Sequence, residues 1–502
     1  MMVNLMNPDE DFDLLQAPPS NANDLVEDLG LNHLFSAMSQ NDSFVDGVVR
    51  TAILCGLQDP EMIQYRQAVV DDFLHMPTVL VEMYSLVSGV IERKRERFLG
   101  IFGTHPSSIA NESIRLLHLY LEGLKELRII ADEHASKAQS RGLKRFFTML
   151  QEELSDEYLD RAVTYLNGFP YNDEMVMSVQ LGKGHIGTHY TLVQSRTGSN
   201  WLTRTLDIRI RSNRIHIAAH DQYGLRALSD MKDRGLNVVA NALAQSADHI
   251  LNFLTRLKAE LAFFVGCLNL YTRLCSKQEP TCFPFPSKTN ECQYWARGLY
   301  DISLSLSTTE RVVGNDVDAD GKELWVVTGA NQGGKSTFLR SVGVAQIMMQ
   351  SGLFVPAQAL RGSICSGIFT HFRREEDRGM NYGKFVEELS RMDTIVGEIH
   401  SNSLLLLNES FASTSESEGV EIAISLVRAF VEHDIRIVFV THMYEFARQF
   451  YEQRDLGILF LRAGRNPDGS RSFQIQPGTP LSTSFGRDLY DEIFGVNNPI
   501  QP

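Results

Sequence analysis

The sequence predicts a chain of several domains: an α-helical region with a small β insertion, followed by an α/β domain. Two hydrophobic patterns support this division. Apolar residues recur at three- and four-residue steps at Ile114, Leu117, Leu121 and Leu124, as on the buried face of a helix. After about residue 286, short apolar runs typical of strands alternate with helical patterns, which is the order found in α/β domains.

The composition is that of an ordinary globular protein and excludes several classes. The chain has 502 residues, 43% hydrophobic and 22% charged, which excludes fibrous, collagenous and wholly disordered proteins. Its 47 Lys and Arg against 62 Asp and Glu give a net charge of −15, so nucleic acid would need a local basic patch. The six cysteines form no CxxC pair, and we expect reduced thiols without a zinc site.

The first 30 residues predict a weakly ordered, acidic leader, because three prolines lie among a cluster of acids. This start lacks a basic region followed by an apolar stretch, and no apolar run approaches the ~18 residues that span a bilayer. We therefore expect a cytoplasmic protein with no membrane partner.

Helical patterns continue from 31 to about 175, and the period then changes to two. Alternating apolar residues such as Leu206, Ile208 and Ile210 predict a small β insertion over 176–230.

A long helical pattern follows the β insertion, and we assign residues 231–285 to it. From Leu236 to Leu268, apolar residues alternate steps of three and four without interruption. One helix over this stretch would be about 50 Å long at ~1.5 Å per residue, which suits an arm between domains. A Pro- and Cys-rich stretch at 279–287 is the expected linker to the α/β domain.

The strongest motif opens the α/β domain. An apolar run at 324–328 predicts a strand, the loop GANQGGKS follows at 329–336, and an apolar-periodic helix comes next. Strand, glycine loop and helix in this order are typical of a P-loop, and they predict a P-loop ATPase domain over 286–502.

The loop residues have the chemistry that nucleoside triphosphates require. The glycines let backbone N–H groups point at the phosphates, Lys335 reaches the β- and γ-phosphates, and the Ser336 hydroxyl is offered to Mg²⁺. We therefore predict ATP and Mg²⁺ as cofactors. The predicted nucleotide-binding residues of the loop are Gly329, Asn331, Gly333, Gly334, Lys335, Ser336 and Thr337.

Two further apolar strands end in candidate catalytic residues. Glu409 follows the run LLLL at 404–407 and is the predicted general base, and His442 ends the next strand, where it can sense the γ-phosphate. Asn408 stands where an Asp normally supports Mg²⁺. We predict Ser336 and Asn408 as the metal-site residues and, because an amide brings no charge, slow hydrolysis.

These motifs resemble the ATPase domain of the MutS mismatch-repair family in order and spacing. The resemblance covers roughly residues 31–495, and its helical core begins near DPEMIQYRQAV at 59–69. The motifs in the ATPase domain are GANQGGKST at 329–337, FVPAQ at 354–358, KFVEE at 384–388, NESFASTSESEG at 408–419, THMYE at 441–445 and STSFG at 482–486.

The resemblance implies a core and lever over 31–175, a clamp-like insertion over 176–230, a lever and core helix over 231–285, and an ABC-type ATPase domain. It also implies a homodimer in which two ATPase domains enclose two ATP molecules. Each P-loop would be completed by the partner's loop at 410–419, and the predicted interface residues are Ser413, Thr414 and Ser415.

Several positions depart from the family pattern. Val312 stands where the family stacks an aromatic ring on adenine, and Gly383 stands where it supplies a serine to the partner's γ-phosphate. The chain begins essentially at the core, so we expect neither the N-terminal Phe-x-Glu mismatch reader nor its connector domain, and it stops before a C-terminal helix-turn-helix.

The β insertion is the candidate DNA surface. From Lys183 to Arg214 there are six basic residues and one acid, and such residues bind phosphates without reading sequence. An ordinary solvated sheet face has the same pattern, so both interpretations stay open. The candidate DNA-binding residues are Arg204, Arg209, Arg211 and Arg214.

The sequence therefore predicts a slow, MutS-like ATPase that binds DNA in repair or recombination as a nucleotide-switched dimer. One alternative is a nucleotide-gated binding module for RNA, a ribosome or a protein partner. Another is a transporter-type or chromosome-cohesion-type ATPase, against which the stretch 336–408 contains no LSGGQ-like signature.

Overall fold

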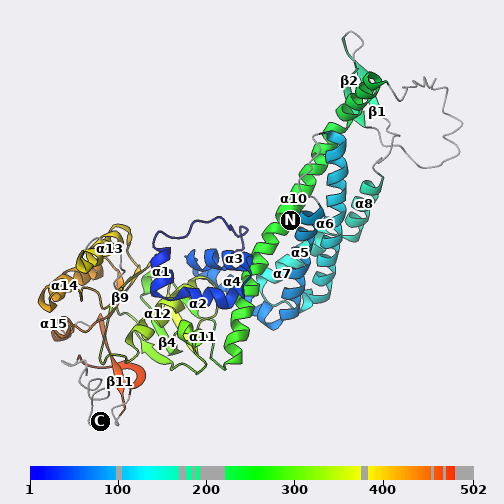
Figure 1. The fold of residues 1–502 in the computed structure, drawn as a ribbon. Coiled ribbons are helices and arrows are strands. Elements are labelled where there is room, and N and C mark those ends of the chain that lie inside the picture. Colours follow the sequence, from blue (N-terminus) through cyan, green and yellow to red (C-terminus); the bar gives the residue numbers. More distant parts are fainter. Residues whose placement is uncertain are drawn as a thin grey trace, which may run out of the picture. The chain divides into compact units, whose positions relative to one another are not determined.

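The computed structural model describes residues 1–97, 105–168, 177–183, 187–192, 221–374, 383–453, 457–466 and 471–480 (Figure 1). The chain divides into two compact units. The first, here called the helical unit, comprises Met1–Val3, Glu82–Lys137 and Arg145–Lys258. The second, the sheet unit, comprises Asn4–Val81, Ala138–Lys144 and Ala259–Pro502.

Long helices form most of the helical unit. The helices that lie wholly or partly in it are α5 (Pro77–Arg97), α6 (Pro106–His134), η1 (Ala135–Lys137), α7 (Arg141–Glu153), α8 (Asp156–Asn167) and α10 (Gln222–Ser276). Ile114, Leu117, Leu121 and Leu124 are buried on one face of α6, which confirms the helix that their spacing predicts.

Within the range expected for the β insertion, β1 (Met177–Leu181) and β2 (Gly187–Leu192) pair in the antiparallel direction. Helix α10 starts at Gln222, earlier than the expected boundary at 231. The Asp221 carboxylate accepts the Gly224 N–H at 3.0 Å, which caps the first turn. With 55 residues, α10 is about 80 Å long, well beyond the expected length (Figure 1).

Two sheets organise the described part of the sheet unit. In the larger one, six strands lie in the order β12-β11-β6-β10-β9-β8, parallel except for the β11–β12 hairpin. Its strands are β6 (Leu324–Thr328), β8 (Ile368–Phe372), β9 (Leu404–Asn408), β10 (Arg436–Val440), β11 (Ile458–Arg465) and β12 (Arg471–Pro477). The smaller sheet has the order β3 (Phe285–Ser287), β7 (Ala359–Ser363), β4 (Tyr294–Leu299), β5 (Asn315–Asp318).

The helices of the sheet unit cover these strands. Those that lie wholly in this unit are α1 (Ala22–Asp28), α2 (Leu31–Ser39), α3 (Ser43–Leu54), α4 (Pro60–His75), η3 (Thr289–Glu291), α11 (Ile302–Ser307), α12 (Lys335–Gln350), α13 (Lys384–Glu398), α14 (Glu416–Glu432) and α15 (Tyr444–Glu452).

Strands β6 and β10 are buried along their whole length, as expected for parallel strands covered on both faces. Gly343 lets α12 approach β9 closely, since a Cβ there would lie 2.5 Å from Leu406 Cδ1. The predicted α/β domain is therefore present, with a sheet whose parallel strands are fixed by the helices around them.

The start of the chain differs from the weakly ordered leader that its acids predict for residues 1–30. Leu5 and Met6 are fully buried, and their backbone N–H groups donate to the Glu260 carboxylate at 2.7 and 3.0 Å. Burial raises the pKa of Glu260 to about 7. Two apolar side chains and a buried hydrogen-bond acceptor thus order a segment whose composition alone indicates disorder.

Among the described residues, no single helix is both long and apolar enough to cross a membrane. By length and composition alone, the bent pair Pro60–His75 and Pro77–Glu96 together meet that test.

Candidate nucleotide-binding site

The predicted site residues meet at the carboxyl ends of the parallel strands of the larger sheet. The central strand β10 pairs in register with β6 on one side and β9 on the other, so that Val440 lies opposite both Val327 and Asn408. All three strands run in the same direction, and their carboxyl ends therefore lie together. Open α/β sheets bind their ligands at the carboxyl ends of their strands.

The loop after β6 has the backbone that phosphate binding requires. Gly329 and Gly334 have φ values of +117° and +89°, a region that favours glycine. At Gly333 a Cβ atom would lie 2.8 Å from the Ala463 Cβ, so this position must also stay small. Helix α12 starts directly after the loop, at Lys335, and its N-terminus carries the positive end of the helix dipole.

Lys335 is 95% buried at the base of this loop. Its Nζ donates to the carbonyl oxygens of Gly329 at 3.1 Å and Ala330 at 2.9 Å. Burial lowers the pKa of Lys335 to about 8, and the nearby Glu409 carboxylate opposes that shift. A phosphate at this position would replace loop carbonyls as the partner of the ammonium group.

Ser336 and Asn408 bring two oxygen atoms together where the metal site is predicted. Ser336 Oγ donates to Asn408 Oδ1 at 3.0 Å, from the first turn of α12 to the end of β9. Hydroxyl and amide oxygens suit Mg²⁺, which keeps several waters and takes further ligands from phosphates. The donor set therefore fits Mg²⁺, although neither group carries a charge.

Glu409 and His442 form a close pair at the same end of the sheet. His442 Nε2 lies 2.7 Å from Glu409 Oε1, and this hydrogen bond is the main reason why the pKa of Glu409 lies below its usual value. Glu409 has φ +55° and Phe411 has φ +64°, which are strained conformations for residues with side chains. The Glu409 N–H donates to the Val440 carbonyl at 2.9 Å, which helps to hold this backbone.

A cavity of about 880 Å³ opens in front of the loop. Its walls come from the P-loop and α12, from the segment Leu304–Asn315, from Glu409 and from Phe473. Of the predicted residues, those lining the cavity are Val312, Asn331, Gly333, Gly334, Lys335, Ser336, Thr337 and Glu409.

Two residues of β12 were missed by sequence reasoning. Phe473 lines the cavity with a half-exposed ring, and Arg471 Nε donates to the Asn331 carbonyl at 2.8 Å. Phe473 supplies an aromatic ring in a pocket where Val312 supplies none. The only local signal for it is an aromatic residue in a short strand pattern more than 130 residues after the P-loop.

The three predicted interface residues make hydrogen bonds within the chain. Ser413 Oγ donates to Glu388 Oε1 at 3.0 Å, and Thr414 Oγ1 donates to Glu418 Oε2 at 2.6 Å. Ser415 caps α14, and Gly383 is the N-cap residue of α13. The loop at 410–419 is therefore ordered by its own hydroxyl groups.

The predicted DNA-binding residues Arg204, Arg209, Arg211 and Arg214 lie outside the described residues, as does the motif at 482–486.

Comparison with known proteins gives two matches to family models. The MutS2 N-terminal domain matches residues 58–277, and MutS domain V matches residues 325–486. The second range contains the P-loop, Glu409 and His442.

The chain is also similar to curated proteins named DNA mismatch repair protein MutS. The relative from Chloroflexus aurantiacus is 30% identical over 266 residues, which cover 49% of this chain and 27% of the relative. The relative from Clostridium kluyveri is 28% identical over 242 residues, which cover 45% of this chain and 28% of the relative. The relative from Thermus aquaticus is 34% identical over 183 residues, which cover 35% of this chain and 22% of the relative. The chain thus spans less than a third of the length of each relative.

Proposed function

Because the chain belongs to the MutS family, we propose that it is an ATPase that binds ATP with Mg²⁺ at this site and hydrolyses it slowly. We further propose that nucleotide controls its binding to DNA, as part of DNA repair or recombination in the cytoplasm. The MutS relatives are named for DNA mismatch repair, which supports DNA as the ligand.

One observation carries this proposal: the P-loop, Glu409 and His442 follow the adjacent parallel strands β6, β9 and β10, Lys335 and Glu409 line one cavity, and His442 pairs with Glu409. A strand-end acid far from the P-loop would have no such role.

The residues divide the work of hydrolysis. Lys335 and the N–H groups at the start of α12 hold the β- and γ-phosphates. Glu409 orients a water molecule and accepts its proton, while His442 fixes the orientation of the Glu409 carboxylate. The water oxygen bonds to the γ-phosphorus as the bond to the bridging oxygen breaks, and ADP leaves with that electron pair.

Ser336 and Asn408 would hold Mg²⁺, directly or through water. When bound, the ion neutralises phosphate charge. With Asn408 in place of an acid, the protein supplies less negative charge to this position, which supports slow turnover.

We also propose the assembly that the family pattern implies. Two copies form a homodimer through their ATPase domains, and Ser413, Thr414 and Ser415 face the partner's nucleotide after releasing their present partners. Val312 and Phe473 flank the base, since both line the cavity. The basic residues of the β insertion contact DNA backbone phosphates without reading mismatches.

The test is size-exclusion light scattering of Glu409→Gln with and without ATP and Mg²⁺, repeated with labelled duplex DNA, junction DNA and RNA. We expect an ATP-dependent dimer that co-elutes with DNA. Lys335→Ala is the control and should neither bind ATP nor dimerise. Co-elution with RNA alone would favour the alternative, a nucleotide-gated module for RNA or a ribosome. A monomer under every condition would contradict the dimer.

A further inference from the structure

A second cation lies beside the predicted catalytic carboxylate. Strand β8 is the other neighbour of β9, and it ends with Phe372 opposite Asn408. The next residue, Arg373, donates its backbone N–H to the Asn408 carbonyl at 3.0 Å. Arg373 Nη1 lies 3.7 Å from Glu409 Oε2, while His442 binds the other oxygen of the same carboxylate.

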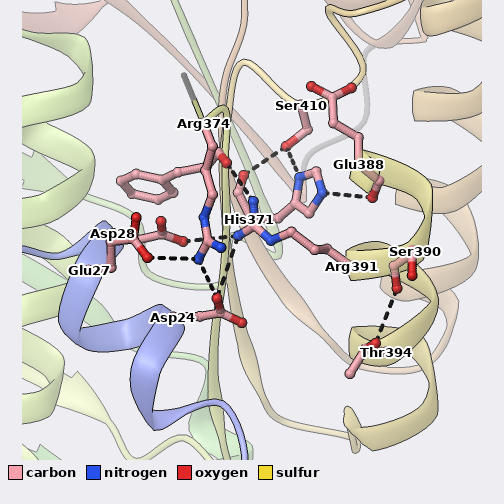
Figure 2. A network of polar contacts seen from close by, with 11 residues as sticks. Asp24, Glu27, Asp28, His371, Arg374, Glu388, Ser390, Arg391, Thr394 and Ser410 are labelled. Atoms are coloured by element: carbon pink, nitrogen blue, oxygen red, sulfur yellow. Dashed lines mark hydrogen bonds and ion pairs between the residues drawn. The ribbon is translucent and has the colours of Figure 1, made fainter. Parts of the chain in front are cut away.

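The backbone that carries Arg373 is held from both sides. Figure 2 shows its neighbour Arg374 pointing toward Asp24 and Glu27 of α1. On the other side, the buried His371 ring contacts Ser410 Oγ through Nδ1 at 2.7 Å, and its Nε2–H donates to the Glu388 carbonyl at 3.1 Å (Figure 2).

Ser410 Oγ also lies 2.9 Å from the His371 carbonyl oxygen, so the end of β8 and the segment after β9 are tied together. The Arg373 side chain is free by comparison. It is 44% exposed, and its contact with Glu409 is long for a hydrogen bond.

The charges around this point favour a move of Arg373 toward bound phosphate. ATP would bring several negative charges to the cavity that Lys335 lines. The Glu409 carboxylate already has His442 as a partner, so it can release Arg373. A guanidinium group binds phosphate oxygens in pairs and more strongly than it binds an exposed carboxylate in water.

We propose that Arg373 is a further phosphate-binding catalytic residue, which leaves Glu409 when ATP binds and contacts the γ-phosphate from the β8 side. This inference rests on the proposed ATPase function and adds a residue to it. The move does two things. It places a cation where charge develops during hydrolysis, and it frees Glu409 Oε2 to accept the water proton.

The experiment compares Arg373→Ala, Arg373→Lys and wild type by equilibrium binding of fluorescent ATP and ADP analogues, and by single-turnover hydrolysis. In Arg373→Ala we expect ATP affinity to fall about 10- to 100-fold, with ADP affinity within about twofold of wild type, because only ATP has a γ-phosphate. The hydrolysis rate should fall about 100-fold, and Arg373→Lys should recover part of it.

Arg374→Ala is the matched control, since it removes an adjacent arginine whose partners are on α1. It should leave the ratio of ATP to ADP affinity unchanged.

Two results would overturn the proposal. Arg373→Ala could bind both nucleotides as wild type does, or it could weaken both equally, which is the mark of a structural role. If wild type hydrolyses ATP and loses this activity in Lys335→Ala, such results reject Arg373 alone. A wild-type protein that binds no nucleotide would reject the proposed function and Arg373 together.

Discussion

Asn408 is the residue at which the site departs most from the usual chemistry of a P-loop ATPase. Its amide oxygen accepts the Ser336 hydroxyl at 3.0 Å, so the position is well placed but uncharged. Arg373 and Lys335 lie at the same end of the sheet. With an uncharged Asn408 beside them, the charge of the site is more positive than it would be with an aspartate at position 408.

In Asn408→Asp we expect tighter Mg²⁺ binding and faster hydrolysis, each by about tenfold, because a carboxylate adds a charged oxygen ligand without changing size. A titration of Mg²⁺ against single-turnover rate measures both quantities. Turnover equal to that of wild type would show that the missing charge does not limit the reaction.

His371 makes stability depend on pH. Burial lowers the pKa of its imidazole to about 4, against 6.5 for an exposed histidine. Between these values the unfolded chain binds the proton and the folded one does not, so stability is complete above pH 6.5 and falls as the pH drops toward 4.

We expect up to about 3 kcal/mol of unfolding free energy to be lost in this window because of His371. Urea unfolding at pH 7.5, 6, 5 and 4 measures it, with His371→Asn as comparison. The variant should be less stable than wild type at pH 7.5, and the difference should shrink as the pH falls. A constant difference would assign the loss to other groups.

At the scale of elements, Arg273 near the end of α10 and Lys277 just after it hold the wall of the cavity in front of the P-loop. Lys277 Nζ donates to the carbonyl oxygens of Ser305 and Thr308, and Arg273 Nη2 donates to the Leu306 carbonyl at 3.0 Å. Just beyond the helix, the buried Glu279 carboxylate accepts the Val312 N–H at 3.0 Å. The segment that lines one side of the cavity is thus positioned by the helix.

Glu279→Ala should weaken ATP and ADP binding equally, by about tenfold, because the Val312 N–H loses its acceptor and this wall loosens. Isothermal titration with each nucleotide measures the effect, and equal loss distinguishes it from the selective loss expected at Arg373. Unchanged affinity would mean that the wall keeps its shape without Glu279.

The elements also show what local sequence could predict. The P-loop, the strand-end acid and the strand-end histidine each lie within a short motif, and the family prediction made from them is confirmed by the comparisons. Phe473 and Arg373 depend on strand register, which brings distant residues together and leaves no local pattern. The acids of the first 30 residues indicate a weakly ordered leader, whereas Leu5 and Met6 are buried and donate their N–H groups to Glu260, a partner some 250 residues later that no local pattern reveals.

At the scale of the whole molecule, α10 has residues in both units, as do α5 and α7, and it is the longest of the three. Its last turns contact the cavity wall, and its first turns follow the β insertion in sequence. A rigid helix transmits a displacement at one end to the other, and on the proposed function α10 is therefore the expected link between nucleotide and DNA.

Lowering the stability of this helix should separate ATP hydrolysis from the control of DNA binding by ATP. Asn241 and Gln245 are exposed on α10, and replacing both with Gly weakens the helix by roughly 1–2 kcal/mol without removing a buried side chain. We expect ATPase activity within about twofold of wild type and a smaller effect of ATP on DNA affinity, measured by fluorescence anisotropy. The matched Ala pair should behave as wild type; full ATP control in the Gly variant would exclude α10 as the link.

The contact of α1 with β8 has a consequence for the order of synthesis. Strand β8 is the last in the sheet order, and the Asn21 side-chain amide donates to its Ile368 carbonyl at 2.7 Å, while Asp24 pairs with Arg374. Nearly 350 residues separate these partners, so during synthesis α1 cannot dock until β8 has been made. Such distant contacts slow folding, and until they form the β8 edge stays open to strands of other chains.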